Sequence, residues 1–265
     1  MFAIDTHVHL LVSKAAKPDW DEIAFATQAA GNDGLTTLCI TEHLDALHYP
    51  ALIRGLFLEQ RLGGRLLSPG VLKLANGLCL SCGAEVSIGG GGDIGVHAEP
   101  EVLLGLDQRK GAYSLADLIG TLRSQPSPFA MVAHHVYWPG KSIAALTRQA
   151  RNLDALELPA KDWEHVDQYL ELAADLALPV VGGSDAHTWI QIGSARSIAQ
   201  VAPDEQFSPG RLCRLLKDGA IRAQTLASAA ERIRLSGILR TRLDTARRPA
   251  PAAGHERGAG HAVHA

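Results

Sequence analysis

Short apolar runs recur along the chain and alternate with stretches in which apolar residues return every three or four positions. The apolar runs are typical of buried strands, and the stretches between them are typical of amphipathic helices. This alternation predicts an α/β domain built on parallel strands. The expected strands are residues 2–5, 36–41, 78–86, 94–97, 129–134, 153–158 and 179–182.

Helices are expected between these strands. Asp19 is a suitable N-cap for the first helix, and Gly31 interrupts the pattern after it. Ser114 and Asp117 have the spacing of a helix-starting capping box. The glycine-rich segment 87–95 predicts a turn or hairpin between two strands. The expected helices are residues 19–30, 51–62, 114–124, 143–150, 163–177, 212–216 and 227–246.

The length and composition favour one large domain. The 265 residues are 46% hydrophobic and 20% charged, which is enough to bury a sizeable core. We expect one barrel-type domain over residues 1–246. Residues 247–265 are rich in Ala, Pro, Gly and His and poor in bulky apolar side chains, so we expect a disordered tail. The histidines of that tail have no strand context and are not expected to be ligands.

Charge and cysteine content exclude some function classes. A formal net charge of -3 provides no general attraction for nucleic acid. The chain shows neither a secretory signal pattern nor an apolar run long enough to span a membrane, which favours a cytoplasmic protein. The four cysteines are too few for a disulfide scaffold. Cys79 and Cys82 have CxxC spacing, but residues three apart on a strand face opposite sides, so we expect reduced thiols.

Candidate chemistry concentrates where the predicted strands end. His7 and His9 lie two residues apart, and the side-chain period of a strand places both on one face. Such a pair alone is weak evidence for a metal site. The evidence strengthens because metal-type residues also follow five later apolar runs, and strand ends converge in a barrel active site. These later residues are Glu42-His43, Glu85, His97, His134 and Asp185-Ala186-His187.

In type, order and rough spacing these motifs resemble the PHP (polymerase and histidinol phosphatase) superfamily of metal-dependent phosphoesterases. The resemblance covers residues 2–200, and Gly-Gly-Ser-Asp-Ala-His-Thr at 182–188 is its most specific piece. It implies a distorted TIM-like (β/α)7 barrel with two or three divalent metal ions at the C-terminal ends of the strands. Imidazoles and carboxylates without thiolates suit Zn, Mn or Fe.

The resemblance implies that His7, His9, Glu85 and Asp185 bind one metal ion and that Glu85 bridges to a second. Adjacent cations would then bind phosphate oxygens and lower the pKa of a bridging water, so that hydroxide attacks the phosphorus. Glu85, Asp185 and His187 are therefore the expected catalytic residues, since Asp185 or His187 can assist the leaving group.

The remaining ligands that the resemblance implies are His97 and His134 at the second site and His43 and His187 at a third. One departure affects the third site: the family usually has a His or Asp where this chain has Ala15. Asp19 is the nearest replacement, although it also suits a helix cap. Glu42 is expected to support a histidine, and His135 to lie beside the site rather than to bind metal.

Substrate contacts are expected from residues near the ligand motifs. Arg196 is the first candidate for binding the non-bridging phosphate oxygens, followed by Lys141 and Lys161. Trp138 could form an apolar wall for the leaving group. The expected substrate is a small-molecule phosphomonoester, as in a histidinol-phosphatase-like reaction, and a nucleic-acid substrate is disfavoured by the net charge.

Three other functions stay open at this point. Amidohydrolase barrels also begin with Asp-x-His-x-His, although this chain has no lysine convincingly placed as a bridging ligand. A phosphodiesterase or nuclease is compatible with the family. A metal-binding domain without catalysis is disfavoured because nearly the whole ligand set is present.

Overall fold

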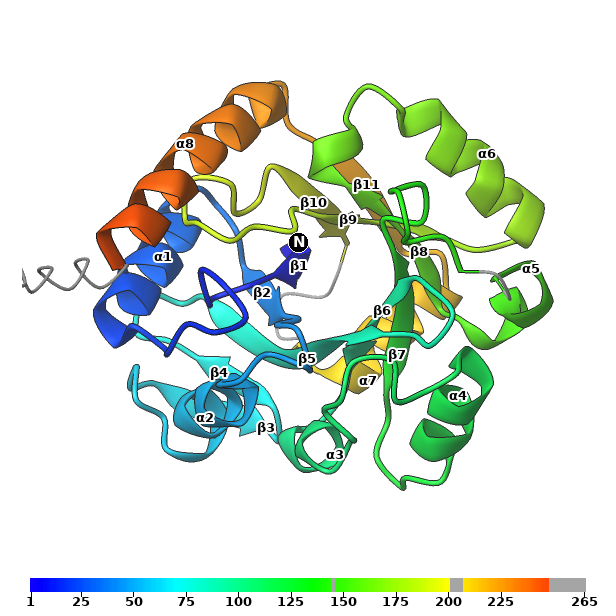
Figure 1. Ribbon diagram of the computed structural model, residues 1–265, viewed down its shortest axis with the longest axis horizontal. Coiled ribbons are helices and arrows are strands. Elements are labelled where there is room, and N and C mark those ends of the chain that lie inside the picture. Colours follow the sequence, from blue (N-terminus) through cyan, green and yellow to red (C-terminus); the bar gives the residue numbers. More distant parts are fainter. Residues whose placement is uncertain (144–145, 201–206, 248–265) are drawn as a thin grey trace, which may run out of the picture.

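A computed structural model describes residues 1–143, 146–200 and 207–247. Its strands form a nearly closed barrel with helices packed around the outside (Figure 1). The strands are β1 Phe2–Val8, β2 Thr37–Ile40, β3 Arg65–Ser68, β4 Val71–Lys73, β5 Cys79–Ser87, β6 Asp93–His97, β7 Ala130–His134, β8 Ala155–Pro159, β9 Val180–Gly183, β10 Ala195–Ala199 and β11 Ile221–Thr225.

The strand order around the barrel is β11-β10-β1-β2-β5-β6-β7-β8-β9, and β9 also contacts β1 and β11. The seven expected strands are all present, and the expected distorted α/β barrel is confirmed. Parallel pairing holds for β1, β2 and β5 and for β7, β8 and β9. It does not hold for β6, which runs antiparallel to both neighbours, or for β10, which runs antiparallel to β1 and β11.

The helices lie close to their expected positions. They are α1 Trp20–Asn32, α2 Tyr49–Ile53, α3 Pro100–Leu104, α4 Leu115–Arg123, α5 Leu146–Gln149, α6 Val166–Leu176, α7 Pro209–Lys217 and α8 Ala229–Arg247. Three short helical segments are also present, namely η1 Arg54–Leu58, η2 Ala150–Asn152 and η3 Ala160–Asp162. The helix expected to reach residue 62 instead ends at Leu58 after the π-helical turn η1. The sequence pattern missed α3, a single short helix that begins with Pro100.

Two caps explain where helices begin. The side chain of Asp19 accepts a hydrogen bond from the Glu22 backbone N–H, so Asp19 is the N-cap of α1. Ser114 accepts from the Asp117 N–H at 3.2 Å, and the Asp117 side chain accepts from the Ser114 N–H, which confirms the capping box of α4.

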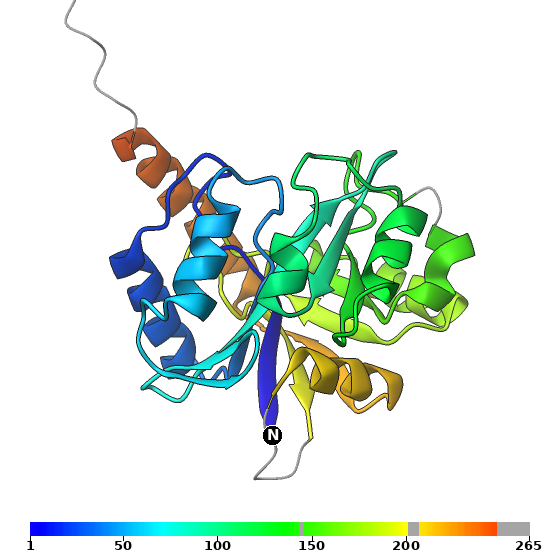
Figure 2. The same ribbon diagram turned by 90° about the horizontal axis from the view of Figure 1, so that it is seen from below.

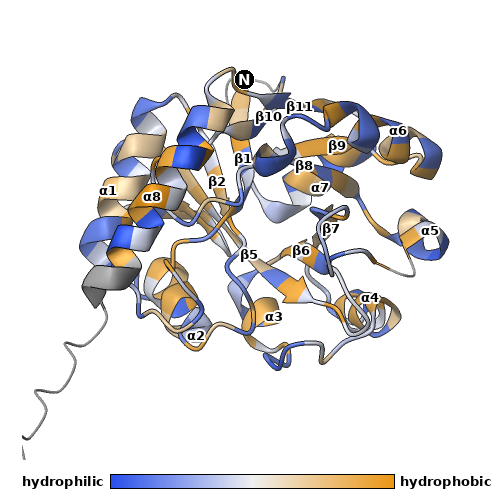
Figure 3. Ribbon diagram, turned by 45° about the horizontal axis from the view of Figure 1, so that its top comes forward, coloured by the Kyte–Doolittle hydropathy of each residue, from blue (hydrophilic) through white to orange (hydrophobic). Residues whose placement is uncertain are grey.

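The apolar residues of the strands divide between two core clusters. Leu38, Leu80 and Cys82 belong to the larger cluster, which includes residues of the surrounding helices. Cys39 and Val132 belong to the smaller cluster, which α7 completes at one end of the barrel (Figure 2). Cys79 packs against the smaller cluster and Cys82 lies in the larger one, so the CxxC thiols face opposite sides as expected. Figure 3 shows hydrophobic and hydrophilic residues mixed along the surrounding helices.

No helix within the described ranges is long and apolar enough to cross a membrane. The expected disordered tail lies outside the described residues apart from Arg247, and so do its histidines.

Replacing Ser114 with Ala removes the side-chain acceptor at the start of α4. We expect the free energy of unfolding to fall by about 1 kcal/mol, measured by urea denaturation. Ser114→Asp keeps an acceptor at this position and should retain most of the stability. Equal stability of the Ala and Asp variants would contradict the capping role.

Candidate metal centre

The side chains that follow the parallel strands converge at one end of the barrel. Backbone bridges draw the strand ends together: Val8 pairs with Ala186, and His43 pairs with Glu85. The ends of parallel strands meet on one side of a barrel, which places their polar residues in one cluster. The residues whose ligand-type atoms converge are His7, His9, His43, Glu85, His134, His135, Asp185 and His187.

The carboxylate of Glu85 lies at the centre of the first group. Its Oε1 is 3.3 Å from His7 Nε2, 3.1 Å from His134 Nδ1 and 3.0 Å from His135 Nε2. The rings of His7 and His134 stack with their centroids 3.8 Å apart. All four residues offer ligand atoms within 4.8 Å of one another, which is close enough for a shared cation.

Two further groups share members with the first. His7 Nε2 and His9 Nε2 are 2.9 Å apart, and His9 Nε2 is 3.1 Å from Asp185 Oδ1. His9 also joins His43 and His187 in a third group, which contains three imidazoles and no carboxylate. Because the groups overlap at His7 and His9, cations held by them would be neighbours.

The geometry of the cluster fits divalent cations. Ligands about 2.0–2.2 Å from one cation lie roughly 3–3.5 Å from each other, close to the separations around Glu85. His43 Nδ1 lies 2.6 Å from Glu85 Oε2 without hydrogen-bond alignment. His134 Nε2 and His135 Nδ1 are buried and have no hydrogen-bond partner among the described residues. Nitrogen and oxygen donors without thiolate suit Zn, Mn or Fe.

Burial and neighbouring charges act in opposite directions on these groups. Burial would raise the pKa of Glu85, but the surrounding histidines outweigh it and hold the pKa well below its usual range. Burial, assisted by His134, lowers the pKa of His7. Burial also opposes protonation of His9, but Glu42 and other carboxylates raise its pKa to about 10. Glu85 and His7 are therefore in the protonation states that bind metal, whereas His9 would release a proton when a cation binds.

Glu157, which sequence reasoning missed, supports the cluster from strand β8. Its Oε1 lies 2.7 Å from His7 Nδ1, and its Oε2 accepts a hydrogen bond from the His135 backbone N–H at 3.0 Å. This contact directs the other ring nitrogen of His7, Nε2, toward the cluster. The available signal was a lone acidic residue in an otherwise apolar strand, because an unpaired charge would not be buried there.

Glu42 has the supporting role expected for it. Its Oε1 lies 3.2 Å from His9 Nδ1, and its Oε2 accepts from the backbone N–H groups of Leu10 and Leu11. The backbone bonds fix the carboxylate, and the carboxylate in turn orients the His9 ring.

Asp5 ties β1 to the segment that carries Asp185. Its carboxylate accepts backbone N–H bonds from Ser184 at 3.0 Å and Gly193 at 2.7 Å. Burial raises the pKa of Asp5 to about 6, although these bonds act in the opposite direction. Asp185 itself has a φ of 47° and His135 a φ of 27°, uncommon left-handed conformations that recur at functional sites.

Two glycines leave room for the cluster. A Cβ atom on Gly95 would lie 2.1 Å from His134 Nε2, and one on Gly183 would lie 2.2 Å from Glu157 Oε1. Side chains at these strand positions would displace the residues that form and support the cluster.

His97 is expected as a ligand but belongs to none of the groups found among the described residues. It lies at the C-terminal end of β6, and β6 runs antiparallel to β5 and β7. Its end therefore points away from the side where the other strands end. His97 is fully buried, and burial lowers its pKa to about 3. The turn after β7 instead brings His135 into the first group.

Two expected substrate-binding residues lie beside the cluster, and a third does not. Lys141 pairs with Asp93 at the start of β6. Trp138 stacks on His135 with ring centroids 4.4 Å apart. Arg196 is 8% exposed in β10, where it bonds to Asp33 and to the Gly193 carbonyl. Arg196 therefore has a packing role in the structure, away from the cluster.

Comparisons with known proteins agree with the fold. A family profile described as PHP-associated matches residues 163–221. No curated protein matched the chain. The crystal structure of PsfC from Pseudomonas syringae PB-5123 has 36% identity and a TM-score of 0.80, and the match covers 91% of this chain and 98% of PsfC.

More distant structures share the fold alone. The lesion-specific endonuclease PfuEndoQ from Pyrococcus furiosus has 14% identity and a TM-score of 0.60, over 84% of this chain and 57% of its own. An Endonuclease Q complex with a 27-mer duplex that carries an abasic lesion has 15% identity and a TM-score of 0.57, over 83% and 58%. The extensive match to PsfC, the PHP-associated segment and the ordered histidine and carboxylate motifs lead to one conclusion: this chain belongs to the PHP superfamily, in the family of PsfC.

Proposed function

We propose that the protein is a metal-dependent phosphoesterase that prefers a small-molecule phosphomonoester. The observation that carries this proposal is the position of Glu85, whose two carboxylate oxygens lie within 3.3 Å of nitrogens from His7, His134, His135 and His43. A carboxylate in that position suits a bridge between adjacent divalent cations, an arrangement used by hydrolases that cleave phosphate esters.

The proposed ligands differ from the sequence expectation at one position. We take His135 rather than His97 as a ligand because His135 belongs to the first group and His97 does not, although the buried ring of His97 lies near enough to His134 and His7 for burial and these two histidines to lower its pKa. His7, His9 and Asp185 would hold one cation, and Glu85 lies where it could contact both this cation and a second one. The other proposed ligands are His134 and His135 at the second site and His43 and His187, with His9 nearby, at a third.

When bound, the divalent cations supply positive charge beside the phosphoryl group and a water of lowered pKa. Residues around the proposed ligands orient the ligand side chains. Glu157 and Glu42 fix the ring nitrogens of His7 and His9 that face it. Burial holds the pKa of His187 well below its usual range, so this imidazole suits cation binding better than proton donation. Burial would raise the pKa of Asp185, but Lys161, His9 and His7 outweigh it and hold the pKa well below its usual range, so this carboxylate also suits cation binding better than proton donation.

A nuclease is the alternative within the same superfamily. Endonuclease Q, which has a related fold, has been crystallised with a duplex substrate that carries an abasic lesion. This chain spans 57% of the PfuEndoQ chain, and its net charge of -3 gives no general attraction for DNA. An amide hydrolase is disfavoured because a carboxylate, that of Glu85, rather than a lysine lies between His7 and His134, and Lys161 instead pairs with the carboxylate of Asp185.

Removing the cations should abolish phosphate release. We expect the protein as purified to contain Zn, Mn or Fe by elemental analysis and to release phosphate from members of a panel of sugar, nucleotide and amino-alcohol phosphates. Chelation, or His7→Ala combined with His9→Ala, should reduce the rate to background and lower the metal content. His165→Ala, at an exposed position, is the matched control. Full turnover by the double variant would contradict the proposal, and cleavage of phosphodiesters alone would favour the nuclease.

Replacing Glu157 with Gln should weaken cation binding while leaving the fold intact. Glutamine keeps an oxygen near His7 Nδ1 but removes the charge that strengthens this contact, and loss of such support lowers metal affinity about 10–100-fold. Titration of the metal-free protein with Zn or Mn measures the change. Glu164→Gln makes the same chemical change at an exposed position and should bind Zn or Mn like wild type. Unchanged affinity in Glu157→Gln would show that Glu157 is not a supporting residue.

A further inference from the structure

The short helix η3 places two adjacent charged residues beside two different proposed metal ligands. It directly follows β8, the strand that carries Glu157, and its last two residues are Lys161 and Asp162. Both side chains are partly buried. Lys161 contacts Asp185, and Asp162 contacts Trp138, whose ring lies against His135. One turn of backbone therefore reaches two of the three ligand groups.

The ammonium of Lys161 pairs with one oxygen of Asp185 and leaves the other oxygen for the cluster. Lys161 Nζ lies 2.5 Å from Asp185 Oδ2, whereas Asp185 Oδ1 lies 3.1 Å from His9 Nε2. Because Asp185 is buried, water screens this ion pair much less than it screens a surface pair. Lys161 therefore fixes which oxygen of Asp185 is turned toward the histidines of the cluster.

Trp138 connects Asp162 to the group around Glu85. Its indole Nε1 donates a hydrogen bond of 2.9 Å to Asp162 Oδ2, and the hydroxyl of the buried Tyr169 donates to the same oxygen. The indole stacks on the His135 ring with an interplanar angle of 13° and centroids 4.4 Å apart. A ring held in this way restricts the tilt of the imidazole packed against it. Asp162 therefore orients His135 through Trp138.

The two halves of this arrangement also contact each other. Lys161 Nζ lies 5.1 Å from the centre of the Trp138 ring, within the range of a cation–π contact. The indole has a single N–H donor, and Asp162 uses it. Lys161 and Trp138 were both expected to contact substrate, but their polar groups are directed at protein residues. These contacts favour a positioning role for both side chains.

We propose that Lys161, Asp162 and Trp138 form a brace that sets how Asp185 and His135 face Glu85, and thereby the separation of the two cations that these ligands would hold. This η3 brace rests on the metal centre of the proposed function and extends it to a segment outside the ligand motifs. Its members act through other residues, so they are positioning residues. The separation of two cations matters because both must contact one phosphoryl group.

Titration of the metal-free protein with Mn tests the Lys161 half of the brace without requiring turnover. Lys161→Met should weaken Mn binding about 10–100-fold, as expected when a ligand loses its supporting contact. Lys161→Arg keeps the charge and should retain most of the affinity.

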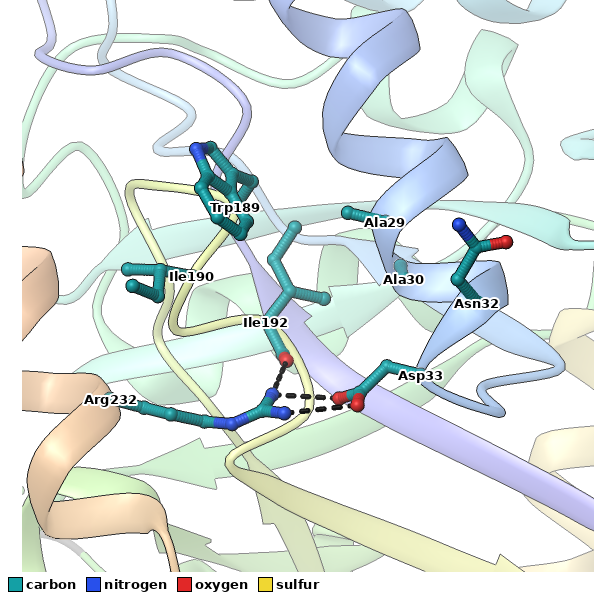
Figure 4. Close-up of a pocket in the computed structure, with 8 residues that line it drawn as sticks. All are labelled: Ala29, Ala30, Asn32, Asp33, Trp189, Ile190, Ile192 and Arg232. Atoms are coloured by element: carbon teal, nitrogen blue, oxygen red, sulfur yellow. Dashed lines mark hydrogen bonds and ion pairs between the residues drawn. The ribbon is translucent and has the colours of Figure 1, made fainter.

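Arg232→Met is the matched control for Lys161→Met. The side chain of Arg232 is 24% exposed and that of Lys161 is 27% exposed, and Arg232 also pairs with a carboxylate, that of Asp33 (Figure 4). Asp33 belongs to none of the ligand groups found among the described residues. Arg232→Met should therefore lower the unfolding temperature but bind Mn like wild type.

The same titration tests the Asp162 half. Asp162→Ala should weaken Mn binding because Trp138 loses its acceptor, and Asp162→Asn, which keeps an oxygen for the indole N–H, should restore most of the affinity. Asp154→Ala is the control, since Asp154 is also half-buried and accepts a backbone hydrogen bond from Met131, but it precedes β8 rather than following it. Lys161→Gln and Trp138→Phe test the same two contacts if a Met or Ala variant does not fold.

Electron paramagnetic resonance of the Mn-loaded protein reports the separation of the ions. Wild type should give the spin-coupled spectrum of adjacent Mn(II) ions, and Lys161→Met and Asp162→Ala should weaken the coupling or give isolated ions. Folded variants of both residues with the affinity and spectrum of wild type would overturn the brace. Failure of the proposed function is distinguishable, because the brace predicts altered Mn binding in these variants whether or not wild type releases phosphate from any ester.

Discussion

The burial of the Glu85 carboxylate among histidines is the constraint on which the rest of the site depends. Glu85 is 1% exposed, and nitrogens of four histidines surround it. A buried carboxylate is costly unless positive charge compensates it. Protonated imidazoles can supply that charge, but crowded imidazolium ions repel one another, and the pKa of His7 is lowered in part by His134. Divalent cations compensate the carboxylate while leaving the histidines neutral, so the cluster is better suited to metal than to protons.

Strand pairing and side-chain hydrogen bonds within the barrel hold these groups in place. Parallel pairing of β1, β2 and β5 brings His7, His43 and Glu85 to one end. Asp5 joins β1 to the segment after β9 through backbone bonds, which fixes Asp185 beside His9. Gly95 lacks the side chain that would collide with His134. Hydrogen bonds and close packing therefore fix the positions of these residues within the protein.

The strands and the main ligand motifs could be predicted from sequence because each has a local signal. Buried strands are apolar runs, and His7 and His9 share a face through the period of the strand. Strand direction has no such signal. The antiparallel course of β6 sets His97 opposite Gly83 and Ala130 rather than at the strand ends that carry Glu85 and His134, although His97 also follows an apolar run.

Long-range contacts account for the other differences. His135 enters the cluster through a left-handed turn after β7, and Glu157 reaches it across the barrel. Arg196 lies near the last motif in sequence, but β10 turns it toward Asp33. The residue types thus indicate a metal site, but the fold is needed to say which residues belong to it.

The most direct measurement is anomalous X-ray diffraction, at the absorption edges of Zn, Mn and Fe, from crystals of the protein as purified. The account predicts at least two anomalous peaks a few ångströms apart, with Glu85 between them and with His7, His9 and Asp185 on one of them. Peaks would then overlie the converging histidines, and His135 rather than His97 would contact the second ion. A fully ordered cluster without anomalous signal, or a single ion away from Glu85, would contradict the account.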